Sequence, residues 1–303
     1  MKVILNVLRE ETYRSFSEEL EAIVELLNNW IELIPREISG WVQCSNSILG
    51  VLLFHSWKIT NWIGYEILNG KYFEAFKNIR FVLEASVLSV ILEGVIEERV
   101  YEEWGMLSEL GLKVEIFKLW EKLKDKGAYR KKQKNKMSMI EQCVKRFIDE
   151  FELSEERKEK HAKVYISILS DERLGYSVPK MIEECMRLLS VKDKEDIEDT
   201  LKSTWRILNK YTHFTYTFIE TTLNDPEFAF VEKMNEKLFT ECFEAYLNTM
   251  DLFYSVLCWR FPNIMERMKG KVIDWWNKNF NRRFMLTEKV IQLLTEESGS
   301  ENS

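Results

Sequence analysis

Residues 71–104 read KYFEAFKNIRFVLEASVLSVILEGVIEERVYEEW and determine what fold we expect of the chain. The stretch contains no proline, and it is rich in leucine, isoleucine, valine and glutamate. Such a composition without interruption is typical of a long helix. The dipeptide Asn69-Gly70 directly before it is a turn signal. We therefore predict the longest helix of the chain here, with a tight turn at its start.

The same pattern continues along most of the 303 residues. Only 11 glycines and 4 prolines occur, whereas a β-sandwich or barrel of this size needs turn residues every 8 to 12 positions or so. The other expected helices are Glu11–Leu33, Gly40–Leu68, Leu112–Leu123, Met137–Phe151, Ser154–Ser170, Val178–Leu189, Asp193–Leu223 and Lys233–Arg260. The prediction is an all-α multi-helix bundle of about nine helices with a charged helical insertion.

The domain boundaries follow from shifts in composition. Residues 1–111 and 192–295 carry most of the apolar content and are expected to form the bundle core. Residues 112–191 are more charged and are expected to form a helical subdomain. Within it, residues 125–136 read DKGAYRKKQKNK and are interpreted as a basic loop. Residues 296–303 are predicted to be a disordered tail.

Several classes of protein are disfavoured by charge and cysteine usage. A net charge of −7 and a pI near 5.4 exclude a globally basic, nucleic-acid-coated surface. Five widely spaced cysteines without a C-x-x-C pair indicate buried thiols in a reducing compartment. His55 and His161 have no partner at metal-ligand spacing, so neither a metal nor a cofactor is expected. The longest apolar runs contain charged residues and no signal peptide is evident, so no membrane partner and a cytoplasmic location are expected.

A charged pair interrupts the most apolar part of the longest predicted helix. Arg80 and Glu84 are the only charged residues between Ile79 and Leu92, and their spacing of four places them on one helix face. An ion pair in apolar surroundings is expensive to desolvate, so something other than stability can explain its presence. The alternative is a structural pair that fixes the position of a neighbouring helix.

A second group of polar residues lies in WRILNKYTHFTYTF. Arg206, Asn209 and His213 follow one another at steps of three and four, which puts them along one stripe of a helix. A guanidinium can hold a phosphate with two hydrogen bonds, and an imidazole can transfer protons near neutral pH. These residue types suit phosphodiester chemistry. The alternative is a structural histidine among aromatic residues.

The Arg206-x6-His213 pattern resembles the signature of the HEPN superfamily of helical prokaryotic ribonucleases and toxins. Residues 70–76 (GKYFEAF), followed by Arg80 and Glu84, resemble a motif of poorly characterised prokaryotic helical proteins, some of them associated with phage defence. In HEPN ribonucleases a polar residue usually follows the arginine. Here that position is Ile207, and Asn209 is the nearest polar candidate.

The resemblance implies a metal-independent endoribonuclease of the toxin or defence type. Arg206 would stabilise charge on the phosphorus, His213 would be general acid or base, Asn209 would orient them, and Arg80 and Glu84 would organise the site. Its implied partners are RNA, a second copy of the chain in a homodimer, and an antitoxin or other protein. The basic residues Arg130, Lys131, Lys132 and Lys134 could bind RNA phosphates, or could simply be solvated. The competing hypothesis is a non-enzymatic helical module that binds a protein or small ligand, with a buried Arg/Glu/His polar network.

Overall fold

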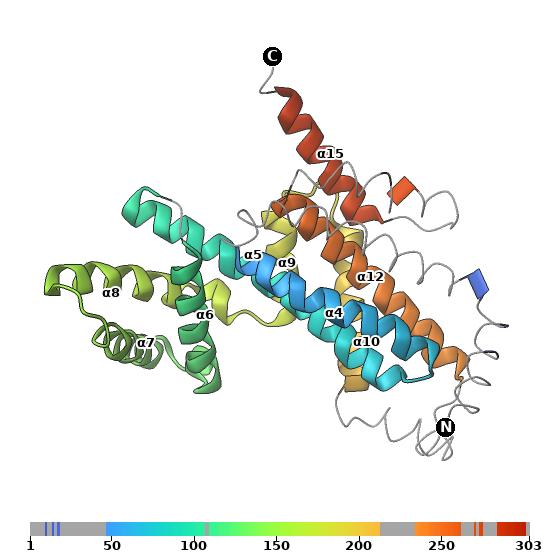
Figure 1. Cartoon of the computed structure of the whole chain (residues 1–303), viewed down its shortest axis with the longest axis horizontal. Helices are drawn as coiled ribbons and strands as arrows, with labels where there is room; N and C mark the ends of the chain where they lie inside the picture. The colour runs from blue at the N-terminus through green and yellow to red at the C-terminus, as the bar shows by residue number, and fades with distance from the viewer. Residues whose placement is uncertain are drawn as a thin grey trace. The chain divides into compact units, whose positions relative to one another are not determined.

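The computed structural model describes residues 47–106, 109–212, 234–261 and 284–300, together with positions 10, 14, 17, 18, 270, 273 and 274. These described residues contain nine α-helices, two 3-10 helices and no strand. In chain order they are α4 (Ile48–Leu68), α5 (Tyr72–Trp104), α6 (Leu110–Asp125), η2 (Ala128–Arg130), α7 (Gln133–Ile148), α8 (Glu155–Ser170), η3 (Glu172–Gly175), α9 (Val178–Leu188), α10 (Glu195–Thr212), α12 (Glu236–Arg260) and α15 (Met285–Ser300) (Figure 1). The all-α multi-helix prediction is confirmed.

The chain divides into two compact units. The first comprises Met1–Trp41, Leu53–Ser86 and Leu189–Ser303, and the second comprises Val42–Leu52 and Val87–Leu188. The sequence placed the start of the charged subdomain at residue 112. In the structure the second unit also takes in the C-terminal part of α5, from Val87 onward.

In the first unit, α12 contacts both α10 and α15. Most of α12 from Leu238 to Cys258 is buried, including the large side chains of Tyr246, Phe253 and Tyr254. The residues of this span that are not buried are polar and recur along one side of the helix: Thr240, Glu241, Glu244, Asn248 and Asp251. The rest of its surface is apolar and packs inside the bundle. The helix begins at Asn235, whose side-chain Oδ1 accepts a hydrogen bond from the Leu238 N–H (3.0 Å) and so caps the helix N-terminus.

The turn between α4 and α5 agrees with the prediction. Gly70 adopts a φ of 73°, a left-handed conformation that favours glycine. The Asn69 side chain donates to the carbonyl of Tyr65 (2.5 Å), which satisfies one of the last carbonyls of α4. The sequence predicted a helix over residues 40–68, and α4 forms its part from Ile48 onward. Trp62 and Tyr65 of α4 are 60% and 40% exposed, and residues 40–46 lie outside the described part.

The second unit is built around α6, α7 and α8. The buried residues Ile140, Val144 and Ile148 recur every fourth position of α7 and form one apolar face, and α7 packs against α8. The loop after α8 is held to α6, because Trp120 Nε1 donates to the carbonyl of Leu174 (3.1 Å).

Two sequence predictions are corrected by the structure. Residues 125–136 are not an open loop, because they include η2 and the start of α7. The segment is ordered by contacts with α8: Tyr129 Oη donates to the Leu169 carbonyl (3.1 Å), and buried Lys136 Nζ donates to the Ser170 carbonyl (2.9 Å). The predicted tail also begins too early, since residues 296–300 belong to α15 and Glu296 accepts a hydrogen bond from Gln292 Nε2 (3.0 Å).

The remaining helix boundaries agree within a few residues where the structure describes them. The expected helix at Glu11–Leu33 lies outside the described residues apart from isolated positions, and so does the part of Asp193–Leu223 beyond Thr212. Within the described residues, no helix combines the length and the apolar character that a membrane span requires.

Candidate functional site

The ion pair of Arg80 and Glu84 lies at the edge of the apolar part of α5. Arg80 Nε donates to Glu84 Oε1 across 2.7 Å, as their spacing of four predicted. The two side chains are 22% and 34% exposed, so the pair is half-buried rather than enclosed in the core. A half-buried pair keeps part of its hydration.

Two residues of α10 contact this pair. Arg80 Nη1 donates to Thr212 Oγ1 across 2.8 Å, and Trp205 Nε1 donates to Glu84 Oε1 across 3.2 Å. Glu84 Oε1 therefore accepts from both Arg80 and an indole N–H. The two helices singled out in the sequence do face each other, and their polar groups meet. We call Arg80, Glu84, Trp205 and Thr212 the α5–α10 cluster.

Aromatic packing holds the two helices together beside the cluster. The Tyr211 ring stacks on Phe76 of α5, with centroids 4.5 Å apart and planes 13° apart, and it also contacts Phe73 at 6.2 Å. Burial, followed by a hydrogen bond with Glu241, raises the pKa of Tyr211 well above its ordinary value, so the phenol stays protonated. Lys210 Nζ lies 3.0 Å from Tyr211 Oη. The stacked Tyr211 and Phe76 rings therefore add an apolar contact between α10 and α5 beside the polar cluster.

The predicted catalytic residues lie directly beside the cluster in the sequence. Arg206 follows Trp205 on α10 and is exposed, while Asn209 is half-buried. His213 follows Thr212 and lies outside the described residues. Sequence reasoning missed Trp205 and Thr212. Their signal was their spacing of seven, which places both on the flank of α10 that faces α5.

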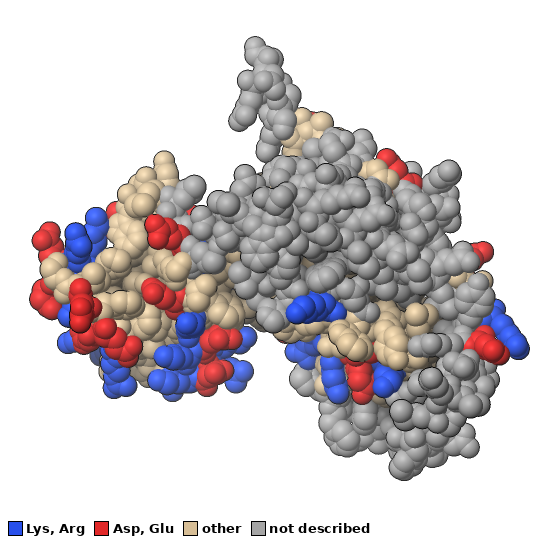
Figure 2. Space-filling model, viewed as in Figure 1, with Lys and Arg blue, Asp and Glu red and all other residues tan. Residues whose placement is uncertain are grey.

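The predicted RNA-binding residues all belong to the second unit. Arg130, Lys131, Lys132 and Lys134 are exposed at η2 and at the start of α7. Lys136 differs from them, because burial lowers its pKa and its ammonium lies 5.0 Å from the Tyr129 ring centroid. Figure 2 shows Lys and Arg side chains interleaved with Asp and Glu on the visible face of this unit. Arg130, Lys131, Lys132 and Lys134 therefore form a small exposed basic cluster on a surface that also carries acidic residues.

A buried ion network in the second unit was not foreseen. Lys113 of α6 is 1% exposed, and its Nζ lies 3.2 Å from Glu93 Oε1 and is also paired with Glu97. Glu93 Oε2 in turn accepts from Ser47 Oγ (2.7 Å). The network links the residue before α4 with α5 and α6, and its contacts explain how these charges are accommodated away from water.

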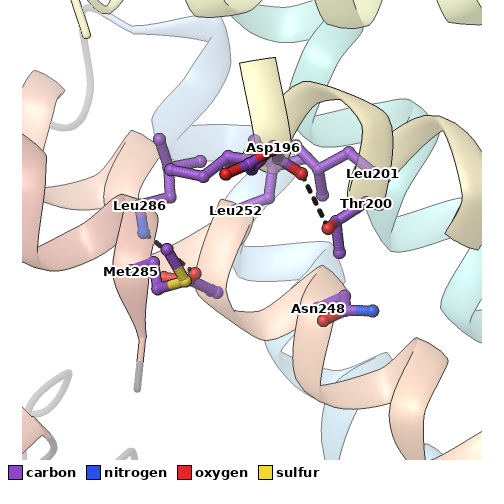
Figure 3. A pocket seen from close by; sticks show the side chains of 9 residues that line it. Asp196, Thr200, Leu201, Asn248, Leu252, Met285 and Leu286 are labelled. Carbon is purple, nitrogen blue, oxygen red and sulfur yellow. Dashed lines mark hydrogen bonds between the residues drawn. The ribbon is translucent and has the colours of Figure 1, made fainter. Parts of the chain in front are cut away.

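A pocket of about 260 Å³ lies among α10, α12 and the start of α15 (Figure 3). Its polar groups are occupied by structural contacts. Asp251 accepts from the backbone N–H groups of Leu286 (3.0 Å) and Thr287 (2.9 Å), and Thr200 Oγ1 donates to the Asp196 carbonyl (2.8 Å). These bonds cap and connect helices, so this pocket is a weak candidate for chemistry.

No group of three or more His, Cys, Asp or Glu residues placed to hold a metal ion occurs within the ranges that the structure describes. The α5–α10 cluster is the place where Arg80 and Glu84, which the sequence singled out, contact the helix that bears Arg206. Comparisons of the chain with protein-family models, with curated proteins and with solved structures found no match.

Proposed function

We propose that this chain is a metal-independent endoribonuclease resembling the HEPN superfamily, of the toxin or defence type, and that it acts in the cytoplasm. The observation that carries the proposal is the hydrogen bond from Arg80 Nη1 to Thr212 Oγ1 (2.8 Å). It ties the anomalous ion pair of α5 to the residue that directly precedes His213 on the chain.

The chemistry assigned to the site needs one cation and one proton carrier. Arg206 would bind the scissile phosphate through two N–H groups and stabilise the charge that develops on its oxygens. His213 would take the proton of the attacking 2′-hydroxyl or give a proton to the departing 5′-oxygen. Asn209 would orient these groups, three residues from Arg206 on the same helix face.

Arg80 and Glu84 would act as positioning residues. Glu84 accepts hydrogen bonds from Arg80 and Trp205, so it holds the Arg80 side chain against α10. The Arg80 guanidinium would add positive potential beside the phosphate. A pair spaced by four on a helix keeps this geometry without depending on a loop.

The partners in this proposal are RNA, a second copy of the chain and an antitoxin or other protein. In the second unit, exposed Arg130, Lys131, Lys132 and Lys134 would bind the RNA backbone, each neutralised phosphate making the affinity more sensitive to salt. A homodimer would bring two Arg206–His213 motifs together.

The experiment is cleavage of single-stranded RNA in EDTA by the wild-type chain, His213→Ala and Arg206→Ala. The wild type should cleave, and each variant should lose about a hundredfold or more of the rate. Arg187→Ala is the matched control, because Arg187 is a 58% exposed arginine in the second unit. Equal cleavage by the wild type and His213→Ala, or none by either, would refute the proposal.

The second candidate is a non-enzymatic module that binds a protein or small ligand. The observation that favours it is that Arg80 and Glu84 bond to each other and to Thr212 and Trp205 within the protein. A purely structural network has this property. A folded wild-type chain that neither cleaves nor binds single-stranded RNA would favour this alternative.

A further inference from the structure

The second unit contains an open pocket of about 460 Å³ that the proposed ribonuclease activity does not use. It lies among the C-terminal end of α5, the start of α6, the end of α7 and the middle of α8. This volume is in the range of small-molecule sites. The residues that decide its chemistry are Trp104, Glu109, Glu115, Phe151, His161 and Tyr165.

Aromatic rings make up much of the wall. The Trp104 and His161 rings meet edge-on with centroids 5.1 Å apart, and His161 and Tyr165, one turn apart on α8, stack at 6.4 Å. Phe147 connects Tyr165 (5.9 Å) with Phe151 (5.0 Å). Trp104, Phe151 and His161 are all half-buried, so their rings are partly accessible to a ligand.

The charged groups of the wall are acidic. Glu109 is exposed and Glu115 is half-buried, and no Lys or Arg is found among the described residues that line the pocket. Tyr165 Oη donates to Glu115 Oε2 across 2.5 Å. This bond fixes the orientation of the Glu115 carboxylate in the pocket wall. Burial, together with this hydrogen bond, raises the pKa of Tyr165, so the phenol remains the donor.

We propose that this pocket binds a small organic cation, an alkylammonium group whose charge pairs with Glu115 while its carbon atoms contact the Trp104 and Phe151 rings. Aromatic faces attract ammonium groups through their quadrupoles, and a nearby carboxylate adds direct charge attraction. A neutral apolar ligand would displace water from the Glu115 carboxylate without replacing the hydrogen bonds that the water makes, and the carboxylate would repel an anion. The combination of rings and carboxylates therefore selects a cation.

The test compares n-butylammonium with butan-1-ol and butyrate, three probes of similar size and different charge, at constant ionic strength. Binding is followed by the indole N–H signals of the ¹⁵N-labelled full chain, with the Trp104 signal assigned by Trp104→Phe. Butylammonium should shift the Trp104 signal in a saturable way and leave that of Trp205, in the first unit, unchanged. Butan-1-ol or butyrate binding as tightly as butylammonium would overturn the proposal, and so would the absence of a shift.

The carboxylate is tested by Glu115→Gln, which keeps an acceptor for Tyr165 and removes the charge. It should weaken butylammonium binding about tenfold. Glu159→Gln is the matched control, because Glu159 is a 71% exposed glutamate of α8 outside the pocket wall. Should Glu115→Gln fail to fold, exposed Glu109→Gln serves in its place, with a smaller loss expected. Unchanged affinity in the folded glutamine variant would overturn the proposal.

Discussion

The buried ion network of the second unit gives the sharpest prediction about stability. Lys113 is 1% exposed, Glu93 is 4% exposed, and Glu97 is 26% exposed, so the ammonium neutralises one carboxylate that is buried and one that is half-buried. Removing one partner of a buried pair costs about 3–5 kcal/mol, because the other charge is left buried without a counter-ion. We expect Lys113→Met, which keeps the length of the side chain, to lower the free energy of unfolding by this amount.

The assay is urea and thermal unfolding followed by circular dichroism. For a chain of this size, a loss of 3–5 kcal/mol corresponds to a fall of about 10 °C in the melting temperature. Adding Glu93→Gln should recover part of the loss, because Gln has no charge and its carbonyl can still accept from Ser47 Oγ.

Lys163→Met is the matched control for this substitution. Lys163 also pairs with a glutamate of a helix, Glu159 (3.1 Å), but the two side chains are 67% and 71% exposed. An exposed pair at this spacing contributes about 0.3–0.5 kcal/mol. A loss of less than about 1 kcal/mol in Lys113→Met, or an equal loss in Lys163→Met, would refute the reasoning from burial.

Three further predictions concern other parts of the chain. Asp251→Ala should lower the free energy of unfolding by about 1–2 kcal/mol, because the Asp251 carboxylate caps α15 by accepting from the N–H groups of Leu286 and Thr287. Unfolding in urea measures this loss, and an unchanged free energy of unfolding would contradict the capping role. Burial alone would raise the pKa of Asp171, but hydrogen bonds from Arg173 and Arg99 outweigh it and hold this pKa below its ordinary value. The resulting stabilisation is present above the unfolded-state pKa of about 4 and is lost as pH falls through the folded-state value. Asp171→Asn should therefore lower the free energy of unfolding more at about pH 7 than at about pH 3. An equal loss of free energy at both pH values would speak against the ion pairs. Burial raises the pKa of the Cys185 thiol to about 12. As pH rises above the unfolded-state pKa, the thiol ionises in the unfolded chain but not in the folded one, so its contribution to stability is lost progressively as pH rises toward 12. Between about pH 8 and pH 10 the free energy of unfolding in urea should therefore fall by about 2 kcal/mol more in the wild type than in Cys185→Ala. An equal fall in both proteins would rule out ionisation of Cys185 as the cause.

Most of the fold could be predicted because local sequence signals determine where helices start and stop. Asn69-Gly70 marked the turn that the structure contains, and the predicted helix at residues 71–104 differs from α5 by one residue. The error at residues 125–136 has a physical reason. A run of lysines looks solvated in the sequence, but Lys136 reaches the end of α8 and bonds to the Ser170 carbonyl. Such a contact depends on tertiary packing, which local composition does not contain.

The buried network of Lys113, Glu93 and Glu97 shows the same limit for buried charged side chains. Lys113 lies in LGLKVEIFKLW, where a lysine between apolar residues looks like an ordinary member of an amphipathic helix. Its burial arises because α6 packs across Glu93 and Glu97 of α5. Trp205 was likewise not singled out in the sequence, although its indole N–H donates to Glu84. Neither contact has a signature within one helix.

The Arg80–Glu84 pair could be found from sequence because two charges stood out in an apolar segment. In the structure the Arg80 and Glu84 side chains are 22% and 34% exposed, so the pair is not enclosed in the core. A half-exposed pair at this spacing is worth about 0.3–0.5 kcal/mol, so stability is a weak reason for it. The bonds to Thr212 and from Trp205 place the pair against the part of α10 that bears Arg206, with His213 next in the chain. The charge pairing therefore adds little stability by itself, while the bonds to Thr212 and from Trp205 tie α5 to α10, which is the geometry that the proposed function requires.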